Sequence, residues 1–163
     1  MFLNVDGTRK KFFDAVVGGL SVGVPGMLRM LENAHKEKGV IDWAKLFQPA
    51  IKLAEKGFVV SPRLNQLIKK DKYLRVFATT KNYFHTSEGT PLEVGHILKN
   101  PPFAKTLRLI AKKGADAFYT GDLAQRIVDT VNGASQNPGS LSMADMAAYT
   151  SKRRKPVCMF YRK

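Results

Sequence analysis

Residues 25–57 read PGMLRMLENAHKEKGVIDWAKLFQPAIKLAEKG, and this stretch decides the fold class. Its first half places residues three or four positions apart, the spacing of one helical face: Leu28, Leu31, Ala34 and His35. Pro25-Gly26 precedes this pattern and Gly39 follows it, as expected for a helix start and a glycine C-cap. The stretch therefore predicts amphipathic helices separated by glycine and proline.

The same punctuation predicts helices along the rest of the chain. Asp42 is an N-cap candidate for a short turn, and Pro49 opens a helix that runs up to Gly57. Further helices are predicted over residues 63–75, 101–113 and 121–132. A brief helix is predicted to open at Ser142, which matches the capping-box pattern together with Asp145.

Few strands are predicted. Residues 79–99 are rich in loop-forming residues, with a short strand expected within residues 94–98. Residues 157–161, VCMFY, have the composition of a β-strand, which needs a partner strand. We therefore expect a mainly α fold with at most one or two short strands.

Composition limits the classes of protein to consider. The chain has 163 residues, of which 44% are hydrophobic, so it can bury a core, and disorder is not expected. No apolar run approaches the roughly 20 residues of a membrane-spanning helix, and the first residues lack the pattern of an export signal. One cysteine and three dispersed histidines give little support for a metal site, and no cofactor is expected.

The net charge of +14 is unusual and suggests an acidic partner, such as nucleic acid or an acidic membrane surface. Basic clusters occur at residues 8–11, 69–72 and 152–155. They are scattered along the chain, and no RNA-binding or single-strand-binding module accompanies them. Phe118-Tyr119 is expected to be a core contact rather than a stacking platform. We therefore interpret the basic clusters as solvated surface and expect no specific nucleic-acid site.

One motif suggests nucleophilic catalysis. Gly19-Leu20-Ser21-Val22-Gly23 fits the G-x-S-x-G spacing of a nucleophile elbow, in which a strand-to-helix turn presents the serine hydroxyl. Pro25-Gly26 interrupts the place where the elbow's helix should begin. The downstream sequence is also short for a parallel sheet with an acid and a histidine. A turn that requires small residues explains the motif better.

The remaining candidate side chains have structural explanations. His35 lies on the apolar face of its helix, where a satisfied buried or half-buried histidine is expected rather than a general base. Asp116, Asp122 and Asp129 are six and seven residues apart, which does not pair them as an acid and a base, and Asp122 is expected to cap a helix. Cys158 lies in the predicted strand and is expected to be buried and inert.

In order and approximate spacing, these segments resemble the large subunit of the γ-glutamyltransferase family, also called γ-glutamyltranspeptidase or glutathione hydrolase. The resemblance extends from about residue 12 to residue 161. The matching stretches are SVGVPG at residues 21–26, PAI at 49–51, LAE at 53–55, GADAFYTG at 114–121 and DMA at 145–147. This ordered set is far more specific than the single G-x-S-x-G pentapeptide.

The resemblance implies a role within a larger enzyme. Members are N-terminal-nucleophile hydrolases that transfer or hydrolyse the γ-glutamyl group of glutathione and related amides through a threonyl acyl-enzyme. Residues 1–163 would form one partial domain, the central helical segment around the catalytic αββα sandwich. The family's nucleophile, oxyanion glycine pair and carboxylate-binding arginine match no position of this chain, so no catalytic, substrate-binding or metal-binding residue is assigned.

Several expectations follow from that role. The chain alone should be inactive, and its partners should be the rest of the large subunit and the small catalytic subunit. Helix faces that normally cover the sandwich should be exposed, which favours self-association. Complete bacterial-type members are periplasmic or secreted. A basic, non-enzymatic binding or structural module remains the alternative.

Overall fold

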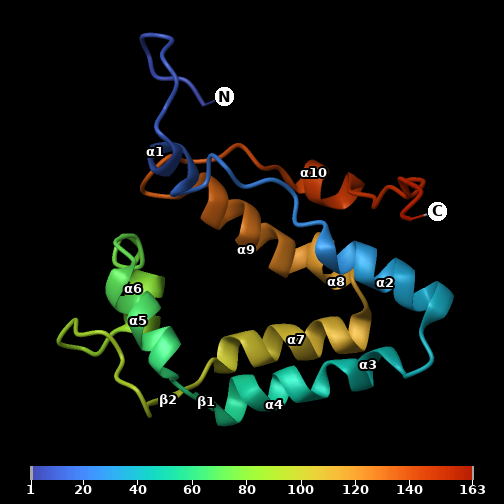
Figure 1. Cartoon of the computed structure of the whole chain (residues 1–163), viewed down its shortest axis with the longest axis horizontal. Coiled ribbons are helices and arrows are strands. Elements are labelled where there is room, and N and C mark those ends of the chain that lie inside the picture. Colours follow the sequence, from blue (N-terminus) through green and yellow to red (C-terminus); the bar gives the residue numbers. More distant parts are fainter. Residues whose placement is uncertain (1, 163) are drawn as a thin grey trace.

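The computed structural model describes residues 2–162, and helices make up most of its regular structure (Figure 1). The elements in chain order are α1 (Phe12–Val16), α2 (Met27–Lys38), α3 (Trp43–Leu46), α4 (Gln48–Lys56), β1 (Phe58–Val59), α5 (Pro62–Lys70), α6 (Ala78–Phe84), β2 (Ile97–Leu98), α7 (Pro101–Lys113), α8 (Asp116–Tyr119), α9 (Gly121–Asn132) and α10 (Met143–Ala148). The prediction of a mainly α fold with one or two short strands is confirmed.

Helix boundaries follow the local capping chemistry. The Asn100 side chain accepts a hydrogen bond from the Phe103 N–H at the start of α7, and Gly114 ends that helix with a φ of +76°. The predicted capping box is present, because the Ser142 N–H donates to the Asp145 carboxylate and the Asp145 N–H donates to Ser142 Oγ. Asp122 is not an N-cap, since it lies in the first turn of α9 and Thr120 occupies the cap position.

Four further predictions, about local structure and burial, are wrong. The helix expected over residues 63–75 ends at Lys70, because the Asp71 carboxylate accepts hydrogen bonds from the Tyr73 and Leu74 N–H groups and forms a turn. Helix α6 begins at Ala78 and occupies the first part of residues 79–99, which were expected to be rich in loop. Residues 157–161 form no strand and are exposed, as is Cys158, which was expected to be buried.

The first core joins α4 to α7, which lie side by side (Figure 1). Ile51 and Ala54 of α4 pack against the fully buried Ala104 of α7. Trp43 of α3 covers the other end of α7, where its indole N–H donates to the Ile110 carbonyl oxygen over 3.3 Å. Helices α4 and α7 form the lower layer in Figure 1.

The second and largest core lies among α8, α9 and α10. Its buried side chains are Ala115, Tyr119, Ala124, Val128, Val131, Leu141 and Met146. Helix α2 reaches this core through Leu28, which packs against its edge. The expected core position of Phe118 and Tyr119 is therefore confirmed.

The third core is small and lies beside the two-stranded sheet. Strands β1 and β2 pair antiparallel, with Phe58 opposite Leu98 and Val59 opposite Ile97. Val60, Leu92 and Leu98 form its buried part, with Leu64, Tyr83 and Phe84 packed around it. Among residues 2–162, no buried residue belongs to more than one of the three cores.

Many large apolar side chains remain exposed on this framework. They include Met27, Met30 and Leu31 on α2, and Leu53, Phe58 and Phe103 around α4 and the start of α7. Leu31 and Ala34 therefore lie outside the core, although the sequence places them on the apolar face of their helix. Within residues 2–162, the helices are too short and too polar to cross a bilayer.

Candidate functional site

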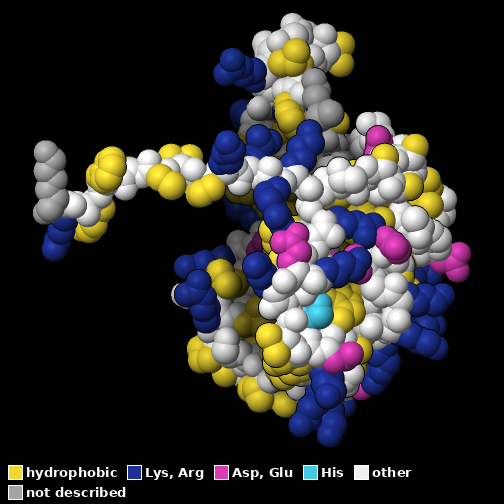
Figure 2. All heavy atoms as spheres, turned by 90° about the vertical axis from the view of Figure 1, so that its right-hand side faces the viewer, with side chains coloured by type: hydrophobic (Ala, Val, Ile, Leu, Met, Phe, Trp, Pro, Cys, Tyr) yellow, Lys and Arg dark blue, Asp and Glu magenta, His cyan; other side chains and the backbone are white. Residues whose placement is uncertain are grey.

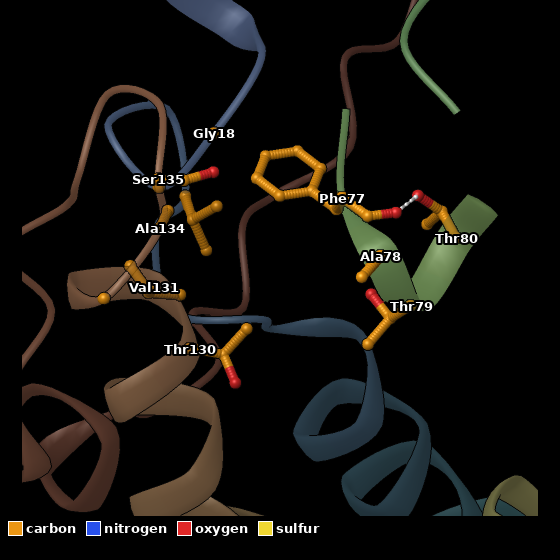
Figure 3. A pocket seen from close by; sticks show the side chains of 12 residues that line it. Gly18, Phe77, Ala78, Thr79, Thr80, Thr130, Val131, Ala134 and Ser135 are labelled. Atoms are coloured by element: carbon orange, nitrogen blue, oxygen red, sulfur yellow. Dashed lines mark hydrogen bonds between the residues drawn. The ribbon is translucent and has the colours of Figure 1, made fainter. Parts of the chain in front are cut away.

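The cavity nearest the G-x-S-x-G motif lies between the turn at Gly18, the start of α6 and the end of α9 (Figure 3). Its volume is about 470 Å³. It is lined by Gly18, Gly19, Val22, Phe77, Ala78, Thr79, Thr80, Thr130, Val131, Gly133, Ala134 and Ser135. Three segments far apart in the sequence therefore meet at one apolar cavity.

The chemistry of this cavity is limited. None of its lining side chains carries an acid or a base that titrates near neutral pH. Thr80 donates its hydroxyl to the Leu74 carbonyl over 2.7 Å, and Thr130 donates to the Arg126 carbonyl over 2.7 Å, so both hydroxyls already have partners. General acid–base catalysis needs a titratable group within hydrogen-bond reach of the substrate. The cavity can hold an apolar group and offers no means of activating a nucleophile.

Ser21 does not form a nucleophile elbow. Its hydroxyl donates to the Val16 carbonyl oxygen over 2.9 Å, no strand leads into the turn, and the next helix begins only at Met27. The glycines have a steric explanation instead. A Cβ on Gly19 would lie 1.9 Å from the carbonyl oxygen of Val131, so only glycine allows this turn to approach the end of α9.

A cluster of charged side chains joins α2 to α8, and it is the most connected polar group in the described chain. The buried Glu32 carboxylate accepts a hydrogen bond from the Ala115 N–H over 2.7 Å and ion-pairs with Arg29 and Lys36. Arg29 also pairs with Asp116 over 2.7 Å and lies over the Tyr119 ring, 4.6 Å from its centroid. The sequence pattern singles out Asp116 but not Arg29 or Glu32, because the partners that join α2 to α8 lie more than 80 residues apart in the chain.

The pKa values in this cluster follow from burial and pairing. Burial is the largest influence on Glu32 and opposes ionisation, but the Ala115 N–H, Lys36 and Arg29 together outweigh it, so its pKa lies below the ordinary value. Burial also disfavours the charged form of Arg29, yet the contact with Asp116 leaves its pKa raised. Every charge in the cluster is compensated, as expected for a structural ion-pair network.

The three histidines do not converge on one site. His35 is half-buried, with its Nε2 atom 2.7 Å from the Ile41 carbonyl oxygen and its ring beside Trp43, as expected for a satisfied histidine. His85 is buried and accepts a hydrogen bond from Arg75 Nε over 3.2 Å, a contact that the sequence did not indicate. Within residues 2–162, no group of three or more His, Cys, Asp or Glu side chains is arranged to hold a metal ion.

The basic clusters remain apart in the structure. Residues 8–11 include Arg9, which forms an isolated bridge with Leu3. Residues 69–72 span the end of α5 and the turn after it, and residues 152–155 follow α10. Arg153 is paired with Glu37 on α2, and Asp129 accepts a hydrogen bond from Gln125 rather than from another predicted site residue. Asp116 and Asp122 line one pocket, whose lining does not include Asp129. The structure thus brings two of the three aspartates together and leaves the basic clusters apart.

Comparisons with known proteins identify the family. The whole chain, residues 1–163, matches the family model described as gamma-glutamyltranspeptidase. It is 38% identical over 149 residues to a glutathione hydrolase proenzyme of Arthroderma benhamiae, covering 89% of this chain and 25% of that protein. The corresponding proenzyme of Bacillus subtilis is 36% identical over 157 residues, covering 96% of this chain and 26% of that protein.

Solved structures agree with the sequence comparison. The crystal structure of Helicobacter pylori gamma-glutamyltranspeptidase superimposes with a TM-score of 0.88 at 32% identity, covering 96% of this chain and 44% of that chain. The Bacillus anthracis transpeptidase CapD superimposes with a TM-score of 0.72 at 34% identity, covering 83% of this chain and 45% of that chain. The chain spans about a quarter of the length of the curated relatives it matches. By sequence and by fold, the chain belongs to the gamma-glutamyltranspeptidase family.

Proposed function

We propose that residues 1–163 form the central helical segment of a γ-glutamyltranspeptidase large subunit, a partial domain that packs around a catalytic αββα sandwich. The share of the relatives' length that the chain spans supports this role. The exposed apolar side chains of α2, α4 and α7 support it further, because a shell segment needs such faces to contact the unit that it covers.

In this proposal the complete enzyme transfers or hydrolyses the γ-glutamyl group of glutathione and related γ-glutamyl amides. A threonine outside these residues attacks the γ-carbonyl carbon, expels the amine and forms an acyl-enzyme, which water or an acceptor amine then cleaves. A glycine pair outside the chain stabilises the oxyanion, and an arginine outside it binds the substrate α-carboxylate.

One observation carries the division of labour between this chain and the rest of the enzyme. The cavity beside the G-x-S-x-G motif has no titratable side chain in its lining, and the Ser21 hydroxyl donates a hydrogen bond to a backbone carbonyl. Without a positioned nucleophile and oxyanion donors, turnover is not expected. The isolated chain should therefore release no chromophore from a γ-glutamyl anilide, even at high protein concentration.

The decisive experiment restores the missing parts. In a chimera, this chain replaces the matching region of Helicobacter pylori gamma-glutamyltranspeptidase, where the TM-score of 0.88 makes the exchange feasible. The chimera should assemble, mature into subunits and release the chromophore, whereas the isolated chain and the enzyme lacking this region should not. Activity of the isolated chain that Ser21→Ala abolishes would refute the proposal.

A further inference from the structure

Residues 149–153, here called the strap, lie along α2 through alternate side chains. A Cβ on Gly26, just before α2, would lie 2.0 Å from Tyr149 Oη, so the tyrosine rests directly on that backbone. The Ser151 hydroxyl accepts a hydrogen bond from the Asn33 side chain over 2.8 Å, and Arg153 pairs with Glu37. The strap is therefore attached at three points.

The spacing of these points shows how the strap is oriented. The contact residues at and on α2 are 26, 33 and 37. They are seven and four positions apart, which places them on one face of the helix. On the strap they are residues 149, 151 and 153, as in an extended chain whose alternate side chains face one way. Residue numbers increase in the same direction along the strap and along α2, so the two run parallel. In Figure 1 the chain that leaves α10 runs in the same general direction as α2.

Residues 154–162, here called the arm, follow the strap and project from the body of the molecule (Figure 2). Their apolar side chains are almost fully open to solvent, with exposed fractions of 99% for Val157, 83% for Met159, 101% for Phe160 and 79% for Tyr161. Within residues 2–162 the arm belongs to no strand or helix. Residues 157–161, which have the composition of a β-strand, therefore pair with no other strand among the described residues.

The pattern of the arm indicates what kind of surface would cover it. A strand in a sheet with one solvated face alternates apolar and polar residues, because only one of its faces is buried. The arm instead has five consecutive apolar residues, 157–161, which is typical of a strand buried on both faces. A suitable partner is a sheet with an unpaired edge and apolar layers on both faces.

We propose that the arm is a docking strand, which the strap on α2 directs onto an open sheet edge in the part of the family protein outside these 163 residues. This proposal rests on the proposed function. The length of the relatives supports the choice of partner, since this chain matches only 44% of the Helicobacter pylori chain on which 96% of it superimposes. Pairing there would cover the apolar run and satisfy its backbone N–H and C=O groups.

A second copy of this chain is a poorer partner for the arm. Antiparallel pairing of two arms would bring the basic residues 152–155 of one copy close to Arg162 of the other. Like charges on facing strands destabilise their pairing. The net charge of +14 on each copy adds to this repulsion.

The test uses the chimera with the Helicobacter pylori enzyme together with the isolated chain. Met159→Ser combined with Phe160→Ser removes two apolar side chains of the arm, and Val5→Ser combined with Val40→Ser is the control, since those valines are equally exposed. Because these four side chains are at least 83% exposed within the described part of the chain, neither pair should change the melting temperature of the isolated chain. In the chimera, the arm pair should lower the yield of matured enzyme at least about tenfold, the loss expected from two apolar contacts.

A backbone variant separates strand pairing from side-chain packing. Met159→Pro removes an N–H group and should also block maturation, because proline cannot donate to a neighbouring strand. A matured wild-type chimera that tolerates both arm variants would overturn the docking strand and leave the proposed function intact. A wild-type chimera that does not assemble would overturn both. An isolated chain that dimerises through the arm would assign the strand to a second copy and refute the stated partner.

Discussion

The hydroxyl of Tyr119 donates a hydrogen bond to the backbone carbonyl oxygen of Pro25 over 2.6 Å. The Tyr119 hydroxyl oxygen also accepts a hydrogen bond from the Arg29 N–H over 3.1 Å, so one buried hydroxyl serves both backbone groups at the start of α2. Tyr149 stacks on the Tyr119 ring at 5.8 Å. This single side chain therefore links α8, the start of α2 and the strap.

Tyr119→Phe should lower the free energy of unfolding by about 1–3 kcal/mol, because it leaves the Pro25 carbonyl and the Arg29 N–H without their partner. Urea denaturation followed by circular dichroism would measure this change. Tyr161→Phe is the matched control, since Tyr161 lies in the exposed arm. Equal stability of the two variants would show that the buried hydroxyl contributes nothing.

The two glycines of the G-x-S-x-G motif should respond differently to alanine. A Cβ on Gly19 would lie 1.9 Å from the Val131 carbonyl oxygen, whereas a Cβ on Gly23 would meet no atom within 4 Å. Gly19→Ala should therefore destabilise the chain by about 3 kcal/mol, and Gly23→Ala by less than about 0.5 kcal/mol. Thermal melting of both variants tests this, and similar losses would refute the steric role of Gly19.

Glu32 should make the stability of the chain depend on acid. Its pKa is lowered in the folded state, so its contribution is complete above the ordinary value of 4.5 and is lost as the pH falls through the lower, folded value. Denaturation midpoints between about pH 6 and pH 3 should fall less steeply in Glu32→Gln than in the wild type.

Glu55→Gln is the control for that pH series. Glu55 pairs with Arg108 on the surface, where solvent screens the interaction, so its removal should leave the acid dependence nearly unchanged. A Glu32→Gln profile parallel to that of the wild type would mean that the buried carboxylate does not govern acid sensitivity. At neutral pH, Glu32→Gln should also be less stable by about 1–3 kcal/mol, since a charged hydrogen-bond acceptor is lost.

Self-association should increase as salt is added. The exposed apolar side chains around α4, β1 and α7 line a cavity of about 450 Å³, whose walls include Leu53, Phe58 and Phe103. At low ionic strength the charge of +14 keeps copies apart, and salt screens that repulsion. Light scattering should show growing assemblies, which Leu53→Ser combined with Phe103→Ser reduces. A monomer at all salt concentrations, with little dye-binding apolar surface, would contradict this.

Local chemistry made much of the fold predictable. The helices over residues 101–113 and 121–132 have the predicted bounds, because Asn100 caps the first and glycines end or flank both. The capping box at Ser142 is likewise a signal contained within four residues. For the site, the sequence explained His35 correctly, since a helical face and a nearby carbonyl suffice to satisfy it.

The failures arose where distant partners decide the outcome. From the sequence alone, Glu32 looks like an ordinary surface residue of a helix. Only the folded structure shows that its carboxylate is buried and accepts a hydrogen bond from the Ala115 N–H. Residues 157–161 have the composition of a strand, but pairing needs a second strand, and residues 2–162 provide none beside them. Cys158 is exposed for the same reason. Composition can predict the tendency of a segment, whereas its pairing depends on what lies next to it.

The division of the interior into three cores has a consequence for how the chain unfolds. They share no buried residue, so the β1–β2 region with α5 and α6 can open while α8, α9 and α10 stay packed. Amide hydrogen exchange should therefore fall into at least two groups with different protection, rather than one cooperative transition. A segment built this way has its cooperativity supplied from outside, by whatever surface holds its separate parts in one arrangement.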